Sequence, residues 1–249
     1  PEIQLGRDAR RFEISRAKFS GSFDDHINTS IPGFKEVQSV VGDAIVKTYG
    51  DTGASMLDVG ASEGALAKTI SESTSGAVET IALDPNPSMI STVESKPPAM
   101  GSSSVLAAFG DTENAGELAW REDDGTEVPY FDSEEKKFDI VHEAMVFQFI
   151  SNMRNAQFSR VKDLMNENGI FITEEKVGDF EGVYNENEDL KDEYKLRHYS
   201  ESDVAAKKER ILARENTEQV EGMNDLMVSR SELEKSLKNN FRYVAQFWD

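Results

Sequence analysis

Hydrophobic positions along the chain follow two alternating spacings, and these predict short strands separated by helices. Apolar runs bounded by turn residues indicate strands, and apolar residues three or four positions apart indicate helices. Strands are predicted at residues 56–59, 78–84 and 105–111, in the first part of 137–150, and at 170–176 and 241–248. Helices are predicted within 29–50 and at 65–74, 87–95, 154–169 and 229–240. Strands that alternate with helices form a mostly parallel, doubly wound α/β sheet.

Turn and capping residues mark the ends of several predicted helices. Gly33 precedes the helix within 29–50, and Gly50 follows it. Ser231 and Glu234 stand at capping-box spacing, which would start the last helix if Ser231 is its N-cap. These residues fix where the first and last of these helices are expected to begin or end.

A single domain over residues 1–249 is expected, because this length suffices for one α/β core with additions. The predicted additions are a helical cover at 1–50, a polar and acidic insertion at 112–136, and a charged, mostly helical elaboration at 179–225. The insertion interrupts the alternation of strands and helices, so we expect it to lie outside the sheet.

Residues 60–64, with the sequence Gly-Ala-Ser-Glu-Gly, match the G-x-S-x-G nucleophile elbow of serine hydrolases. That elbow needs an acid and then a histidine later in the chain. His26 precedes the serine, His142 falls in a predicted strand, and His198 lies in the charged helical region. Since none of these histidines has the required context, the hydrolase interpretation is disfavoured.

The stretch "MLDVGASEGAL" also reads as a strand that ends near Asp58, a glycine-rich turn and a helix, which is typical of a nucleotide-type binding site. The dinucleotide fingerprint fits poorly, because Ser62 and Ala65 occupy two of its glycine positions. The charge of Asp58 would repel a pyrophosphate. It suits a cationic ligand such as S-adenosylmethionine, which carries a sulfonium and an ammonium against one carboxylate.

Two further acids stand at the ends of the next predicted strands. Asp84 ends the second strand, where a carboxylate can accept hydrogen bonds from both hydroxyls of a ribose. Asp111 ends the third strand and could accept from an adenine amine. Because parallel strands end at one edge of the sheet, a ligand is expected there. Apolar walls for its base could come from Met89, Phe109 and Thr112.

Together these stretches resemble the class I S-adenosylmethionine-dependent methyltransferases. The resemblance lies in "LDVGASEGAL", "LDPNPSMI", "FGD", "FDIVHEAMVFQFI" and "LMNENGIFITEEK", between residues 56 and 176. It implies a Rossmann-like methyltransferase fold with S-adenosylmethionine as cofactor, or S-adenosylhomocysteine as product. That superfamily has a seventh, antiparallel strand between strands five and six. This sequence stops after the sixth predicted strand, so the seventh is expected to be missing.

Over most of its length the chain resembles one subfamily, the carboxy-S-adenosylmethionine synthases and their methyltransferase-like relatives. The matching words are "SIPGF", "DPNPSMI", "FQFI", "ITEEK" and "YSESDVAAKKERIL". Those synthases are usually homodimers, combine S-adenosylmethionine with prephenate, and serve the modification of a transfer RNA. The resemblance therefore implies a possible homodimer and a small-molecule substrate.

The resemblance breaks at three positions of the carboxylate-specific site. Phe34 replaces a tyrosine, Ala144 replaces an asparagine, and Lys208 replaces the arginine that grips the carboxylate. Lysine keeps the charge of arginine but not its bidentate fork. We therefore expect a methyltransferase with an unidentified acceptor. A carboxy-S-adenosylmethionine synthase and a non-catalytic S-adenosylmethionine-binding protein are the alternatives.

The candidate cofactor-binding residues lie in the glycine-rich turn, at the strand ends and at those three positions. They are Asp58, Gly60, Ala61, Ser62, Asp84, Pro85, Met89, Gly110, Asp111, Thr112, Phe34, Ala144 and Lys208. Candidates for a general base are His142 and Glu143, at the end of the fourth strand. Since neighbouring strand residues point to opposite faces, at most one of the two is expected to face the cofactor.

Composition excludes or disfavours several classes of function. With 47 acidic and 27 basic side chains the net charge is −20, which disfavours direct nucleic-acid binding. The absence of cysteine excludes disulfides and zinc–thiolate sites. No metal site is expected, because the acidic run 179–193 lacks a defined ligand spacing. The sequence has neither an apolar run of membrane-spanning length nor a leader, so a cytoplasmic location is the default expectation.

Overall fold

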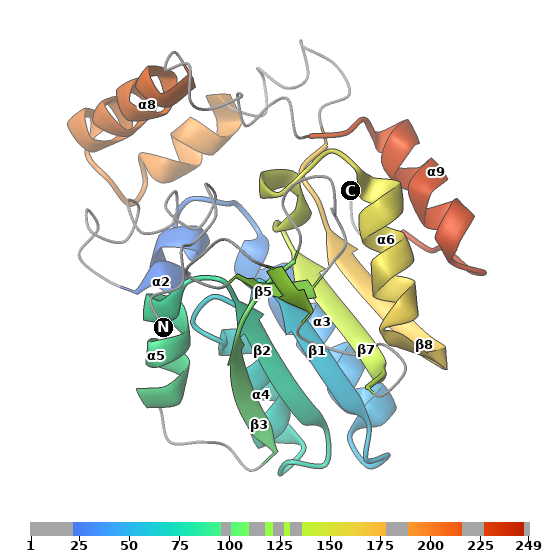
Figure 1. Cartoon of the computed structure of the whole chain (residues 1–249). Helices are drawn as coiled ribbons and strands as arrows, with labels where there is room; N and C mark the ends of the chain where they lie inside the picture. Colours follow the sequence, from blue (N-terminus) through green and yellow to red (C-terminus); the bar gives the residue numbers. More distant parts are fainter. Residues whose placement is uncertain are drawn as a thin grey trace.

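The computed structural model of the chain describes residues 22–95, 101–109, 118–121, 127–129, 136–177, 189–215 and 227–246 (Figure 1). Its main sheet has five parallel strands in the order β3-β2-β1-β7-β8. These strands are β1 (Ser55–Val59), β2 (Glu79–Asp84), β3 (Ser102–Leu106), β7 (Phe138–Ala144) and β8 (Met165–Glu174). The strand order reverses at β1, so the carboxyl ends of β1, β2 and β7 form the edge where ligands bind in such sheets.

Helices cover both faces of this sheet (Figure 1). One face is covered by α3 (Phe34–Tyr49) and α4 (Ala65–Ser73), and the other by α6 (Arg154–Asp163), on which α9 (Arg230–Asn240) packs. Met56 is buried in the core under α3 and α4, whereas its neighbour Leu57 is buried in the core under α6. Because strand side chains alternate between faces, two separate cores form. The predicted doubly wound α/β fold is confirmed.

Several predicted elements are found where the sequence indicated. The helix α3 begins after Gly33, whose φ of 76° favours glycine, and it ends before Gly50. The helix α5 (Pro87–Ser95) matches its predicted range, and α4 ends one residue before its prediction. These elements have both strong periodicity and clear end signals, so their boundaries could be predicted closely.

The third strand of the main sheet lies earlier than predicted. The prediction was 105–111, but β3 pairs Ser102–Leu106 with β2, with Ser102 opposite Thr80. Three consecutive serines carry no apolar alternation, yet their backbone groups complete the ladder at the sheet edge. The segment β4 (Ala108–Phe109) instead pairs antiparallel with β5 (Leu118–Arg121), which pairs with β6 (Glu127–Pro129). Part of the predicted insertion is therefore a small second sheet.

The region around α6 and β8 also differs from its prediction. The helix ends at Asp163, six residues before the predicted end, and β8 begins at Met165. Between β7 and β8 the register shifts, so that Phe138 lies opposite Met165 and Ile140 opposite Ile170. The polar residues between Met165 and Ile170 lie in this irregular part of the strand. Their sequence therefore shows no alternation of apolar and polar residues.

The C-terminal region contradicts two predictions. Residues 241–246, which are the described part of the predicted last strand, form no strand. Among the described residues the main sheet therefore ends at β8, without a sixth or a seventh strand. The cap of α9 is Ser229 rather than Ser231, and Glu232 completes the capping box. Both candidate pairs have the same spacing, so sequence spacing alone could not separate them.

Further helices lie beyond the carboxyl ends of the central strands. There α2 (Phe23–Asn28) contacts the segment before α8 (Glu201–Glu215). The Tyr194 hydroxyl donates to the Asn28 carbonyl at 3.0 Å, and Thr29 and Tyr199 share a hydrogen bond. Parts of the predicted cover 1–50 and elaboration 179–225 thus pack together. Within the described part of the chain, no helix has the length and apolar character needed to cross a membrane.

Candidate functional site

The turn between β1 and α4 has a backbone that only small residues tolerate. Gly60, Ser62 and Gly64 have φ values of 66°, 54° and 70°. A Cβ atom on Gly60 would lie 2.3 Å from Cγ2 of Val146, in the segment that follows β7. The Ala61 N–H donates to the Leu83 carbonyl at 2.9 Å. The turn is therefore pressed between the ends of β2 and β7, and Gly60 is required there.

Asp84 fixes this turn from the end of β2. Its Oδ2 accepts from the Ser62 N–H at 3.0 Å, and its Oδ1 accepts from the Asn86 N–H at 2.8 Å. Burial raises the pKa of Asp84 to about 6, against the lowering effect of the two N–H donors. A carboxylate oxygen has a second lone pair, so both oxygens can still accept from a ligand hydroxyl.

A buried hydrogen-bond donor and an apolar side chain lie near Asp84. The Nδ2 of Asn86 is buried and has no hydrogen-bond partner among the described residues. Met89 is buried, and the Ser62 hydroxyl lies 3.6 Å from its sulfur. Pro85 is half-buried between Asp84 and Asn86. A carboxylate, an unused amide donor and an apolar sulfur beside a tight turn fit the ribose and the base of a nucleoside-type cofactor.

Asp58 was predicted to face a cationic ligand, but in the structure its partner is His142. Its Oδ1 lies 2.7 Å from Nδ1 of His142, directly opposite on β7, and both side chains are buried. Burial alone would lower the pKa of His142, but the hydrogen bond and charge of Asp58, together with Glu174, raise it to about 9. The protonated ring therefore balances the charge of Asp58 within the protein.

The row of charges continues to β8 and α3 on the same face of the sheet. Oε1 of Glu174 lies 3.9 Å from Nε2 of His142 and accepts a hydrogen bond from Gln38 at 2.7 Å. Neither Gln38 nor Glu174 was among the predicted site residues. Glu174 lies at the end of a strand, as Asp84 does, and this position was the signal that could have found it.

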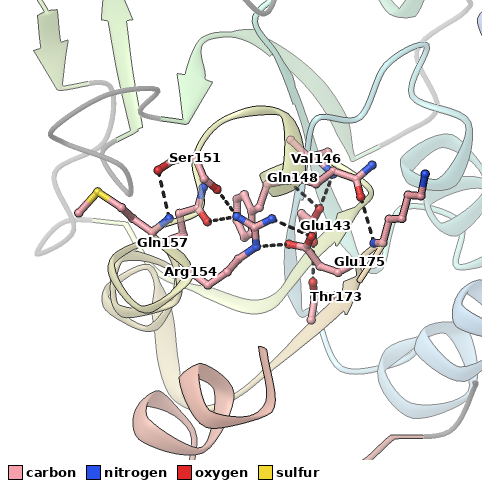
Figure 2. Close-up of polar contacts among 11 residues, drawn as sticks. Glu143, Val146, Gln148, Ser151, Arg154, Gln157, Thr173 and Glu175 are labelled. Atoms are coloured by element: carbon pink, nitrogen blue, oxygen red, sulfur yellow. Dashed lines mark hydrogen bonds and ion pairs between the residues drawn. The ribbon is translucent and has the colours of Figure 1, made fainter. Parts of the chain in front are cut away.

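Glu143 lies on the opposite face, under α6, where both oxygens of its carboxylate accept hydrogen bonds from the protein (Figure 2). Oε1 accepts from the N–H groups of Val146 and Phe147, and Oε2 accepts from the Thr173 hydroxyl. The residue is completely buried, and burial raises the pKa of its carboxyl. Glu143 was predicted as a candidate base. In the structure its carboxylate accepts from the N–H groups at the start of the short helix η1 (Phe147–Phe149).

A buried ion pair supports the same region (Figure 2). Nε and Nη2 of Arg154 lie 2.9 and 3.1 Å from the two carboxylate oxygens of Glu175. A second amino group of Arg154 donates to the Ser151 carbonyl and to Gln157. Burial and the charge of Glu143 raise the pKa of Glu175, while Arg154 opposes them. This cluster joins the start of α6 to Glu175, the residue that follows β8.

The remaining predicted residues are placed as follows. Phe34 is the first residue of α3, and Ala144 ends β7 opposite Glu174. Lys208 lies on α8, where its Nζ is 3.3 Å from Asp192 and its side chain is 60% exposed. Gly110, Asp111 and Thr112 lie outside the described residues. No cluster of three metal-binding side chains occurs within the described ranges.

Comparisons with known proteins agree with this fold. Residues 57–173 match a family model described as a methyltransferase domain. The solved structure of a mycolic acid cyclopropane synthase, complexed with S-adenosylhomocysteine, is 17% identical with a TM-score of 0.51. The match covers 96% of this chain and 71% of that one. A search of curated proteins found no match.

A second match is a plantazolicin methyltransferase bound to S-adenosylhomocysteine, 12% identical with a TM-score of 0.50. It covers 93% of this chain and 70% of that one. An S-adenosylmethionine-dependent methyltransferase from Mesorhizobium loti is 14% identical, covers 54% of this chain and 51% of its own, and has a TM-score of 0.38. The chain spans about half the length of several solved methyltransferases that it matches.

The family match is with a methyltransferase domain and the two solved structures with TM-scores of 0.50 and 0.51 share the fold, but none of them points to the carboxy-S-adenosylmethionine synthases. The family match lies on β1 to β8, which hold the turn at Gly60, Asp84 and the end of β7. Residues 57–173 of this chain are thus similar to a methyltransferase domain, and the chain shares its fold with a solved structure that holds S-adenosylhomocysteine.

Proposed function

We propose that this chain is an S-adenosylmethionine-dependent methyltransferase that acts on a small-molecule acceptor. The observation that carries the proposal is the turn at 60–64, whose Ser62 N–H is bound by the carboxylate of Asp84 at 3.0 Å. This arrangement lies at the carboxyl edge of β1 and β2, inside the segment that matches a methyltransferase domain.

The residues of the turn are suited to hold the cofactor. Asp84 would accept from the ribose hydroxyls, and Met89 would contact the base beside Ser62. Gly60 keeps the turn against the end of β7, because a side chain there would collide with Val146. When bound, the cofactor supplies a methyl group already activated on a sulfonium. The chain then has to align the acceptor and exclude water.

The geometry gives little support to a general base at the end of β7. Both oxygens of Glu143 accept hydrogen bonds within the protein, and the ring of His142 holds its proton at neutral pH beside Asp58. We therefore propose that proximity and alignment, rather than proton removal by these two residues, account for most of the catalysis.

The carboxy-S-adenosylmethionine synthase alternative has weaker support. Lys208, the residue aligned with its carboxylate-binding arginine, pairs with Asp192 instead. Ala144 offers no side-chain donor to a carboxylate. A non-catalytic binding protein would share the cofactor site, so it differs only in the absence of turnover. A homodimer and a cytoplasmic location are further proposals; gel filtration with light scattering would test the first and cell fractionation the second.

Calorimetry with S-adenosylmethionine and S-adenosylhomocysteine tests the proposal at its first step. We expect both to bind, and the absence of binding would rule out every form of the proposal. Incubation with S-adenosylmethionine and a panel of acceptors, read as release of S-adenosylhomocysteine, then tests methyl transfer. Mass spectrometry after incubation with prephenate provides the contrast, because a cofactor that gains a carboxylate would identify the synthase.

A further inference from the structure

The side-chain amide of Asn86, which lies two residues after Asp84, is only half used by the protein. Its Oδ1 accepts from the backbone N–H and from the hydroxyl of Ser88, at 2.9 and 2.7 Å, and so caps the start of α5. Because a backbone N–H can only donate, the capping atom must be the amide oxygen. The other end of the amide, Nδ2, is buried and has no hydrogen-bond partner among the described residues.

Helix capping does not explain this nitrogen. Serine, threonine and aspartate cap a helix with an oxygen alone and bring no amide donor with it. Asn86 is 1% exposed, so bulk water does not satisfy its N–H groups. An unused buried donor is costly unless a ligand or an ordered water completes it. The nitrogen therefore calls for an acceptor atom that the described residues do not supply.

The surroundings of Asn86 favour a neutral acceptor over an anion. The Asn86 N–H donates to Asp84 at 2.8 Å, so a carboxylate lies beside the amide and would repel a phosphate. The first turn of α5 also has no backbone donor left for an anion. Pro87 lacks an N–H, the next N–H is bound by the capping oxygen, and those of Met89 and Ile90 donate to the Asn86 carbonyl.

We propose that Nδ2 of Asn86 donates a hydrogen bond to ring nitrogen N3 of the adenine of the cofactor. The inference rests on the proposed function, in which Asp84 accepts from the ribose hydroxyls. N3 is a neutral acceptor on the edge of the base that faces the 2′-hydroxyl, so a ribose held at Asp84 brings N3 towards Asn86. Pro85, between the two residues, has no N–H that could make this contact. Asn86 thus selects a base that carries an acceptor on its ribose side.

Calorimetry on the full chain tests this contact. The probes are S-adenosylhomocysteine and its 3-deaza analogue, in which a C–H group replaces N3. We expect wild type to bind the analogue about tenfold more weakly, because a buried donor then stays unpaired. Asn86→Ser keeps a capping oxygen but lacks the amide donor. It should bind S-adenosylhomocysteine about tenfold more weakly than wild type and bind both probes equally. Asn239→Ser, at an exposed position of α9, should behave as wild type.

The outcomes separate contact with the cofactor from a purely structural role. If Asn86 only caps α5, Asn86→Ser keeps the wild-type affinity for S-adenosylhomocysteine, and that result overturns the proposal. Equal binding of the two probes by wild type, or an unchanged preference in Asn86→Ser, also overturns it. The ratio of the two affinities is measured within each variant, so it does not depend on a change in stability. Failure of wild type to bind either probe refutes the proposed function itself, and this contact with it.

Discussion

Asp58 and His142 form a buried pair across two neighbouring strands, with Oδ1 of the acid 2.7 Å from Nδ1 of the ring. Asp58 lies two residues before Gly60, at the start of the turn at 60–64. Since His142 supplies the opposite charge, Asp58 does not offer an unbalanced carboxylate to the ligand. The negative charge at this edge is instead provided by Glu174 and Asp84, which the same sheet brings to the ends of β8 and β2.

The first prediction is that the folded chain loses stability as the pH rises from about 6.5 to about 9. The folded ring of His142 has a pKa of about 9, and an unfolded histidine has one of about 6.5. Its stabilising contribution is therefore complete below the unfolded pKa and is lost as the pH rises through the folded one. The shift corresponds to on the order of 3 kcal/mol. Urea unfolding at several pH values measures it.

His142→Gln provides the control for this titration, because glutamine does not ionise in that range. Its unfolding free energy should change much less across the same interval. A wild-type slope that persists unchanged in His142→Gln would mean that other groups cause it.

The second prediction concerns the space at Gly60. Gly60→Ala should destabilise the chain by more than about 2 kcal/mol and weaken cofactor binding, because its Cβ would lie 2.3 Å from Val146 at a positive φ. Gly33→Ala is the matched control, since Gly33 has φ 76° but no atom within 4 Å of the added carbon. It should cost only about 1–2 kcal/mol of backbone strain.

A compensating change tests the collision directly. Val146→Ala should recover part of the loss in Gly60→Ala, and it should recover nothing in Gly33→Ala. Urea unfolding and calorimetry with S-adenosylhomocysteine measure both effects. Equal losses for the two glycine variants would show that backbone strain alone, rather than contact with Val146, governs the turn.

The third prediction is that affinity for S-adenosylhomocysteine decreases as the pH falls through about 6, the pKa to which burial raises Asp84. Protonation removes the charge that strengthens hydrogen bonds from the ribose hydroxyls. Asp84→Asn should weaken binding by about 1–3 kcal/mol and remove the pH dependence. Asp163→Ala, an exposed acid at the end of α6, should affect neither. Unchanged affinity in Asp84→Asn would exclude Asp84 from the site.

Strong local signals made part of this fold and site predictable. Gly33 and Gly50 bounded α3, and the run from β1 through Gly60 to α4 predicted the tight turn at 60–64. The position of Asp84 beside this turn was predictable because it ends the neighbouring strand, and its role towards a cofactor stays a prediction. In each case residues close in sequence determined the local structure.

Features that depend on pairing across the sheet could not be predicted. The contact between Asp58 and His142 joins residues 84 positions apart and depends on the register of β1 with β7. The alternation of side chains did predict that His142 and Glu143 face opposite ways, but not which partners they meet. Ser102 joined β3 through its backbone, which leaves no hydrophobic pattern to detect.

The last prediction concerns the buried ion pair below Glu143. Arg154→Met removes the cation that lies 2.9 Å from Glu175. The buried carboxyls of Glu175 and Glu143 then have no positive charge from Arg154 beside them. The loss should be about 3–5 kcal/mol of unfolding free energy, as for other buried pairs that lose one partner. Lys162→Met, on an exposed position of the same helix, should change stability by less than about 0.5 kcal/mol.

Replacing both partners distinguishes an unpaired charge from lost packing. Arg154→Met with Glu175→Met should recover most of the stability, because no buried charge is left alone. The penalty of the single variant should also shrink at acidic pH. Burial raises the pKa of Glu175, so the folded state takes up its proton first and the unpaired charge disappears. Urea unfolding near pH 5 and pH 7 measures both effects. A double variant less stable than Arg154→Met would show instead that shape, not charge, makes this pair necessary.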